Sequence, residues 1–289
     1  MSKLSEALQS GKFVVTGEVG PPKGVATQEM LESAELYKGK VVAVNVTDQQ
    51  SAVMRLGSLA VCHLLIDMGI EPIFQVTCRD RNRIAIQSDL LSAHVLGVEN
   101  VLCLTGDYVA LGDHPQAKPV FDLDSVSLLQ TAVQLQQGKD LAGKELLGSP
   151  KFFLGATVTP GANPVEPQII KMEKKVKAGA QFFQTQAVYE PEKFEEFMKA
   201  VKHLNVPVLA GIILLKSAGM ARFMNKNVAG VHVPDNLIEE MEKAENKGDK
   251  SVEIAARLVN ELKGLCSGVH IMPIGWEKRV PAMLAAAGL

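Results

Sequence analysis

The feature that most constrains the fold of this chain is a regular alternation of short apolar runs with longer amphipathic ones. Eight runs rich in β-branched residues indicate strands, at residues 13–19, 41–47, 71–77, 100–105, 152–158, 182–188, 207–213 and 268–274. Their nearly continuous hydrophobicity is typical of parallel strands covered on both faces. Each is followed by a helical pattern, at residues 27–38, 51–68, 82–96, 124–137, 165–178, 190–204, 217–225 with 235–263, and 276–287. Eight such units predict an α/β fold, a single (β/α)8 TIM barrel over residues 1–289.

Glycines placed between helices and strands support this prediction. Gly69, Gly97, Gly179 and Gly264 stand where a left-handed residue commonly ends a helix. The first turn, GEVGPPKG, lacks the GxGxxG pattern of doubly wound dinucleotide-binding sheets. The charged run at residues 239–250 indicates a pair of solvated helices with a turn at Gly248.

Composition narrows the class of partner. A net charge of −2 and a pI near 6.3 provide no basic field, so we expect neither nucleic acid nor membrane as a partner. The four cysteines show no metal-binding spacing, so we expect no metal site and free thiols in a reducing compartment. No apolar run approaches the ~18 residues of a membrane span, and the start of the chain lacks the apolar core of a signal peptide. We expect a cytoplasmic protein.

The first strand-like run ends at a carboxylate. In FVVTGEVGPP at residues 13–22, the valines favour a strand and the Pro-Pro pair prevents it from continuing. Glu18 therefore lies near the carboxyl end of the strand, where barrel enzymes place their active sites. This position makes Glu18 a candidate catalytic acid, with a structural ion pair as the alternative.

A second carboxylate, Asp107, follows the fourth strand-like run in the segment TGD. An acid in a partly dry pocket can have its pKa raised and serve as a general acid. The alternative is that Asp107 caps its own loop after Gly106. The segment 106–123 is long for a compact barrel, which predicts a lid or binding loop that substrate or cofactor orders.

Hydroxyl and amide side chains at the strand ends favour a flat heterocyclic ligand. The set is Thr47, Gln75, Gln184 and Gln186. Amides offer both donors and acceptors, which suits a flavin or a pterin. The alternative is that about half of them satisfy polar groups inside the barrel.

Other chemistries have weaker support. GxSxG and P-loop motifs are absent, and among the histidines only His114, in the loop after the fourth strand, is expected near a paired carboxylate. The arginines of RDRNR at residues 79–83 indicate a solvated helix start, with a diphosphate site as the alternative. Lys216, at the end of the seventh strand, allows a Schiff-base lyase or aldolase with Glu18 as proton shuttle, although a solvated lysine is the simpler reading.

Taken together, the strand ends resemble those of methylenetetrahydrofolate reductases. The likeness rests on an ordered set of segments: GEVGPP at 17–22, VNVT at 44–47, VTC at 76–78, LTGD at 104–107, ATVTPGANP at 156–164, KKVKAGA at 174–180 and TQ at 185–186. The resemblance covers the whole chain. It implies a flavin-containing barrel that reduces 5,10-methylenetetrahydrofolate to 5-methyltetrahydrofolate in one-carbon metabolism.

The resemblance also implies roles for individual residues. Glu18 matches the family's catalytic acid, Asp107 matches an acid beside the flavin and the pterin, and Gln186 matches a glutamine that binds the pterin. Glu18, Asp107 and Gln186 would therefore contact the substrate. The implied cofactor-binding positions are Thr47, Gln75, Leu104, Thr105, Gly106, Asp107, Phe121, Asp122, Thr159, Asn163, Lys174 and Lys175.

Departures from the family pattern bear on the cofactor and the electron donor. Gln75 and Asn163 stand where many members have histidine, Thr105 where many have arginine, and Gln168 where an aspartate can hold the adenosine ribose. FAD is expected, with FMN as the alternative. Ala218 replaces an aromatic residue of the NADH-dependent members. The segments TGEVGPPKG, VNVTDQQSAVMR and TCRDRNR are similar to short reductase subunits of anaerobes. The resemblance therefore implies a partner subunit with metal or iron–sulfur centres as electron donor in preference to NADH, and allows an oligomer.

Overall fold

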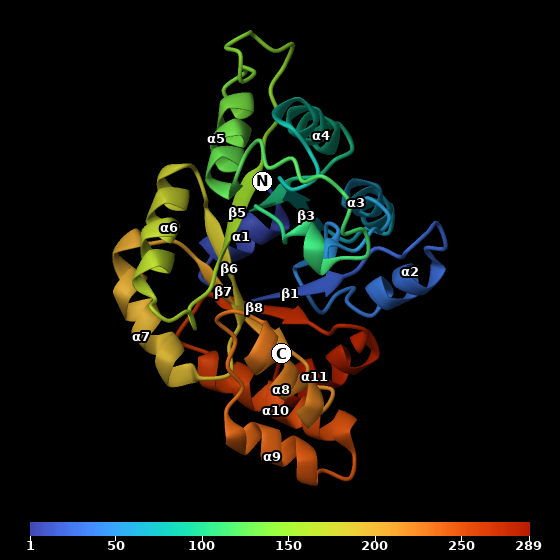
Figure 1. Ribbon diagram of the computed structural model, residues 1–289, viewed down its shortest axis with the longest axis vertical. Coiled ribbons are helices and arrows are strands. Elements are labelled where there is room, and N and C mark those ends of the chain that lie inside the picture. Colours follow the sequence, from blue (N-terminus) through green and yellow to red (C-terminus); the bar gives the residue numbers. More distant parts are fainter.

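Eight parallel strands form a closed barrel in the computed structural model, which describes residues 1–289 (Figure 1). The strands follow one another around the barrel in chain order: β1 (Val14–Val19), β2 (Ala43–Val46), β3 (Pro72–Thr77), β4 (Asn100–Leu104), β5 (Phe153–Val158), β6 (Phe182–Ala187), β7 (Val208–Ile213) and β8 (Gly268–Met272). The last strand pairs with the first, with Thr16 opposite His270. The predicted (β/α)8 fold and all eight strands are confirmed.

Helices follow every strand and surround the barrel (Figure 1). They are α2 (Gln28–Glu35), α3 (Ser58–Asp67), α4 (Arg83–Val95), α5 (Ser125–Gln136), α6 (Glu166–Lys177), α7 (Pro191–Val201), α8 (Ala218–Asn227), α9 (Asp235–Lys243), α10 (Lys247–Leu262) and α11 (Val280–Ala286), with α1 (Lys3–Gln9) before the first strand. None of them combines the length and hydrophobicity that crossing a lipid bilayer requires.

Two details of the helix prediction were wrong. The helix expected from residue 51 begins at Ser58, because Gln49, Ser51 and Ala52 adopt left-handed backbone conformations that interrupt it. The turn expected at Gly248 lies before Lys247, and Gly248 is in the first turn of α10. A Cβ at Gly248 would lie 1.9 Å from the guanidinium carbon of Arg279, so the end of that side chain packs directly over the glycine. The four predicted helix-ending glycines all have positive φ, as expected.

The interior of the barrel has an apolar layer at its amino-terminal end. Eight buried residues form it: Leu4, Leu8, Val14, Ala43, Ile73, Leu102, Phe182 and Leu209. The first two come from α1, which closes this end of the barrel. Two positions further along β1, β2, β3 and β6 stand buried polar residues, Thr16, Asn45, Gln75 and Gln184. The barrel is thus closed by apolar side chains at its amino-terminal end and is polar toward its carboxyl-terminal end, which we call the mouth.

Candidate functional site

Glu18 lies at the mouth of the barrel near the end of β1 and is 8% exposed. Its backbone carbonyl accepts a hydrogen bond from the hydroxyl of Tyr37 at 3.0 Å, and the ring of Tyr37 packs against Gly17. Burial raises the pKa of Tyr37, so this hydroxyl remains a proton donor. The strand that presents the acid is therefore fixed from the outside of the barrel.

A histidine that the sequence analysis missed faces Glu18 from β8. Nε2 of His270 lies 3.4 Å from Oε2 of Glu18, and the imidazole is 3% exposed. The expectation that only His114 lies beside a carboxylate was wrong, although His114 does contact Asp113 at 2.8 Å. His270 is in the middle of an apolar run, where the sequence indicates only a buried strand residue. Its pairing becomes visible once β1 and β8 are neighbours.

The amides of the barrel interior divide into two groups. Gln75 donates to Oδ1 of Asn45 at 3.3 Å, and Gln184 donates to the hydroxyl of Thr16 at 3.5 Å, so both satisfy polar groups inside the barrel. Gln186 is exposed at the mouth and its side chain has no hydrogen bond within the protein. The hydroxyl oxygen of Thr47 is buried and likewise has no partner. The side-chain amide of Gln186 and the hydroxyl of Thr47 are therefore available to a ligand.

The end of β4 approaches the loop after β2. Asp107 is exposed, and its Oδ2 accepts a hydrogen bond from the backbone N–H of Ser51 at 3.0 Å. The carboxylate thus joins two loops instead of capping its own. Gly106 has a φ of +96°, and a Cβ there would lie 3.1 Å from the side chains of Thr77 and Arg79. Glycine lets the chain turn closely over β3 at this point.

The neighbouring predicted positions of this loop have partners in the protein. The hydroxyl of Thr105 accepts a hydrogen bond from the backbone of Ser125 at the start of α5. Phe121 packs edge-on against Tyr108, with ring centroids 6.0 Å apart. Asp122 binds the guanidinium of Arg83 at 2.8 Å, and this hydrogen bonding lowers the pKa of Asp122 to about 2.

Two sites beyond β5 carry the other predicted cofactor positions. Thr159 is half-buried and Asn163 is exposed in the loop before α6. On α6, Lys174 is exposed, whereas Lys175 is 9% exposed and its Nζ donates to the carbonyl of Thr157 at 2.7 Å. Burial, with a smaller contribution from Lys171, lowers the pKa of Lys175 to about 8.

The arginines of the RDRNR segment are paired within the protein. Arg79 is 2% exposed and binds Asp80, and Arg81 binds the buried Asp48 through two nitrogens at 2.7 and 3.2 Å. Arg83 binds Asp122. The expectation of a solvated run was wrong for Arg79 and Arg81. Each guanidinium already has a carboxylate partner, which leaves no unpaired arginine for a diphosphate.

The loop 106–123 is tied to its neighbours through Asp113. This carboxylate binds Lys23 from the loop after β1, accepts from the backbone of Met54 at 3.0 Å, and contacts His114. The hydrogen bond from Lys23, followed by that from His114, holds the pKa of Asp113 well below its usual range. Three loops of the mouth are therefore joined at one ionised carboxylate.

Comparison with known proteins identifies the family. A family model described as methylenetetrahydrofolate reductase matches residues 3–288. The chain belongs to this family. Among curated relatives, methylenetetrahydrofolate reductase 2 of Schizosaccharomyces pombe is 26% identical over 74% of this chain and 35% of its own length. A probable methylenetetrahydrofolate reductase (NADH) of Oryza sativa is 24% identical over all of this chain and 50% of its own length. The chain spans half or less of the length of these relatives.

Solved structures similar to this member of the methylenetetrahydrofolate reductase family show the same fold. An uncharacterised protein from Clostridium thermocellum that binds two copies of 5-methyl-5,6,7,8-tetrahydrofolic acid is 18% identical, with a TM-score of 0.68 over 99% of this chain and 98% of that one. A 2,3-dimethylmalate lyase is 12% identical, with a TM-score of 0.55 over 100% of this chain and 87% of that one. At such identities the likeness concerns the barrel alone.

Lys216, the lysine considered for a lyase, lies beside Trp276 in this reductase-family barrel. Its Nζ is 5.8 Å from the centre of the indole ring, and the side chain is half-buried. A contact of this kind stabilises a positive charge, whereas a Schiff-base lysine must react as the neutral amine. The geometry offers no support for the lyase alternative.

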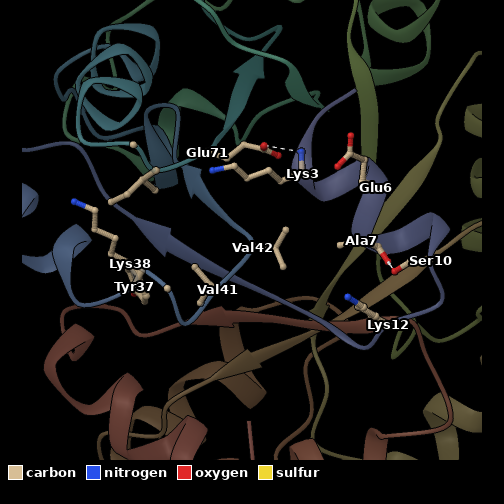
Figure 2. A pocket seen from close by; sticks show the side chains of 13 residues that line it. Lys3, Glu6, Ala7, Ser10, Lys12, Tyr37, Lys38, Val41, Val42 and Glu71 are labelled. Carbon is tan, nitrogen blue, oxygen red and sulfur yellow. Dashed lines mark hydrogen bonds between the residues drawn. The ribbon is translucent and has the colours of Figure 1, made fainter.

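A separate cavity of about 580 Å³ lies at the amino-terminal end of the barrel (Figure 2). It is bordered by α1, the segment after α2 and the segment before β3, with Lys3, Glu6, Lys38 and Glu71 among its lining residues. Glu71 accepts hydrogen bonds from the backbone of Lys3 and Leu4 and so anchors α1. Barrel enzymes carry their chemistry at the other end, so we assign the site to the polar mouth.

Proposed function

We propose that this protein catalyses flavin-dependent reduction of 5,10-methylenetetrahydrofolate to 5-methyltetrahydrofolate in one-carbon metabolism. The observation that carries the proposal is a buried carboxylate, Glu18, at the mouth of a barrel that the reductase family model matches from end to end. The methyltetrahydrofolate-binding structural neighbour supports a folate as the ligand of this barrel type.

The residues at the mouth fit a flavin. The unpartnered hydroxyl of Thr47 and the exposed amide of Gln186 provide hydrogen-bonding groups on opposite sides of the mouth, suited to the ring of a flavin and to a pterin. Leu104, Thr105, Gly106 and Gln75 would border the ring. Thr159, Asn163, Lys174 and Lys175 would hold the ribityl and phosphate part, with FAD expected and FMN the alternative. When bound, a reduced flavin supplies hydride to an electrophilic carbon.

Glu18 would act as the general acid. The methylene bridge of the folate joins two nitrogens, and protonation of one of them by Glu18 opens the ring to an electrophilic iminium. A positioned acid of this kind contributes about 10² to 10⁴ in rate. Asp107 would lie beside the pterin and favour its cationic form by its negative charge, and Gln186 would orient the pterin through its amide.

The electron donor is proposed to be a partner subunit carrying metal or iron–sulfur centres, in preference to NADH. Ala218 is buried at the start of α8 and presents no aromatic ring for a nicotinamide to stack on. A partner that delivers electrons one at a time would need no aromatic surface for a nicotinamide ring.

An absorption spectrum of the purified protein, taken before and after reconstitution with FAD or FMN, tests the proposal first. The flavin is then reduced anaerobically, by NADH or chemically, and mixed with methylenetetrahydrofolate. We expect rapid reoxidation of the flavin and formation of methyltetrahydrofolate. A protein that binds no flavin, or whose reduced flavin ignores the folate, would refute the proposal.

Glu18→Gln tests the acid separately. The variant should bind and accept electrons into the flavin normally, while folate reduction slows by about 10² or more. Glu196→Gln, which makes the same change at an exposed position of α7 without an ion pair, is the matched control and should behave like the parent protein. Normal folate reduction by Glu18→Gln would show that the acid assignment is wrong.

A further inference from the structure

The side chains around His270 determine which of its two ring nitrogens carries the proton. Its Nδ1 faces the hydroxyl of Thr16 at 3.1 Å and Nδ2 of Asn45 at 3.2 Å. Its Nε2 faces Glu18 alone, at 3.4 Å. The imidazole is therefore wedged between two polar side chains below and the acid above.

Asn45 presents a donor to Nδ1, and the hydroxyl of Thr16 can either donate or accept. Asn45 is fixed in orientation, because its Oδ1 accepts from Gln75 at 3.3 Å and its Nδ2 also donates to the carbonyl of Gly17 at 3.4 Å. The hydroxyl oxygen of Thr16 accepts from Gln184, so its proton is free to point at Nδ1. Nδ1 must then be the acceptor, which puts the single imidazole proton of the neutral ring on Nε2, directed at Glu18.

We propose that His270 is a positioning residue that donates its Nε2–H to Oε2 of Glu18 and thereby holds the acid for protonation of the substrate. The proposal rests on the proposed function and adds a residue to it. When Glu18 is protonated, Oε2 is the carbonyl oxygen that accepts this hydrogen bond, and the proton is carried on Oε1. After the proton has passed to the folate nitrogen, the same N–H binds the carboxylate that is left.

At 3.4 Å the two groups are in contact without forming a hydrogen bond, and contacts of catalytic groups often shorten to hydrogen bonds when substrate binds. The arrangement is also fully supported from below. His270 is 3% exposed, and Asn45, which is itself held by Gln75, fixes its ring. The mouth-facing neighbour of the ring on its Nε2 side is Glu18, so this nitrogen can act on the substrate through Glu18.

Two substitutions of His270 distinguish the effect of its Nε2–H group from the effect of its side-chain volume. Glutamine at position 270 places an amide N–H near the position of Nε2, whereas asparagine reaches only as far as Nδ1. We measure reoxidation of chemically reduced flavin by methylenetetrahydrofolate in stopped flow. His270→Asn should slow the limiting rate about 10- to 100-fold with little change in folate affinity, since the residue lies below the mouth. His270→Gln should stay within about threefold of the parent rate.

A double variant tests whether His270 acts through Glu18. Because the two side chains form one unit, adding His270→Asn to Glu18→Gln should cost no further rate. The inference is overturned if His270→Asn reacts at the parent rate, if it slows the Glu18→Gln variant as much as it slows the parent, or if His270→Gln is as slow as Glu18→Gln. The last comparison decides the matter even if the asparagine variant does not fold. A parent protein that itself fails to reduce folate would instead refute the proposed function.

Discussion

Replacing Lys175 by methionine should stabilise the cofactor-free protein at neutral pH. Burial lowers the pKa of Lys175 from the usual 10.5 to about 8, and the side chain is 9% exposed, so solvent screens this effect little. At about 1.4 kcal/mol for each tenfold change in proton affinity, holding the ammonium in this site costs the folded state about 3 kcal/mol. Methionine is unbranched and follows the same path without a charge.

The hydrogen bond to Thr157 partly offsets this gain. Its loss removes a hydrogen bond worth about 1 kcal/mol. The net expectation at pH 7 is a variant more stable by about 2 kcal/mol. Lys174→Met, at the exposed neighbour on the same helix, should change the free energy of unfolding by less than about 0.5 kcal/mol.

The pH dependence gives the sharper test. Below pH 8 Lys175 is protonated in both the folded and unfolded states, and the folded state carries the full cost. Between pH 8 and 10.5 the unfolded state binds the extra proton, so the stability contributed by this group rises with pH. Near pH 10.5 the cost is small and only the lost hydrogen bond remains, so the variant should become the less stable protein.

Urea denaturation of parent and variant at a series of pH values from 7 to 10.5 measures this reversal. Other groups titrate in the same range, but they cancel in the difference between the two proteins. A difference in unfolding free energy that keeps one sign and one magnitude across the range would refute the reasoning, because it would mean that the lysine is not charged at a cost in the folded state.

Two further substitutions follow from the packing and the unpartnered groups. Thr47→Val removes a buried hydroxyl without a partner and should stabilise the cofactor-free protein by about 1 kcal/mol, while weakening flavin binding about tenfold. Calorimetry measures the stability and a flavin titration measures the affinity. Unchanged flavin affinity would argue against contact with Thr47. Gly155→Ala places a Cβ 2.3 Å from the buried ring of Phe182 and should lower the free energy of unfolding by about 1–3 kcal/mol. Gly219→Ala, in an open position on α8, is the control and should be neutral or stabilising. Equal melting temperatures for the two variants in thermal unfolding would contradict the packing argument.

The barrel could be predicted from the sequence because each of its units carries a local signal. Strand runs, helix patterns and terminating glycines are all set by neighbouring residues, and Gly97 or Gly179 ends its helix through its own backbone. The position of Glu18 was equally local, since Pro21 and Pro22 determine where β1 stops. The start of α3 was misjudged because helix-like periodicity before Ser58 does not reveal the left-handed backbone at Ser51 and Ala52.

The contacts of the site were not predictable in this way. His270 lies within an apolar run, and its relation to Thr16 exists only because strands 254 positions apart meet where the barrel closes. Arg81 is charged and lies just before a helix, which indicates solvent exposure, yet Asp48 from another loop pairs with it. Periodicity reports which face of an element is buried, but it carries no information about which side chains meet across the barrel.

The joining of the first and last strands has a consequence for synthesis of the protein. Glu18, on β1, leaves the ribosome before β8, which carries His270 3.4 Å from it. A nascent chain therefore holds an acid that lacks its support until the final strand is added. Under this arrangement, the contact between Glu18 and His270 forms only once β8 has been made and has paired with β1.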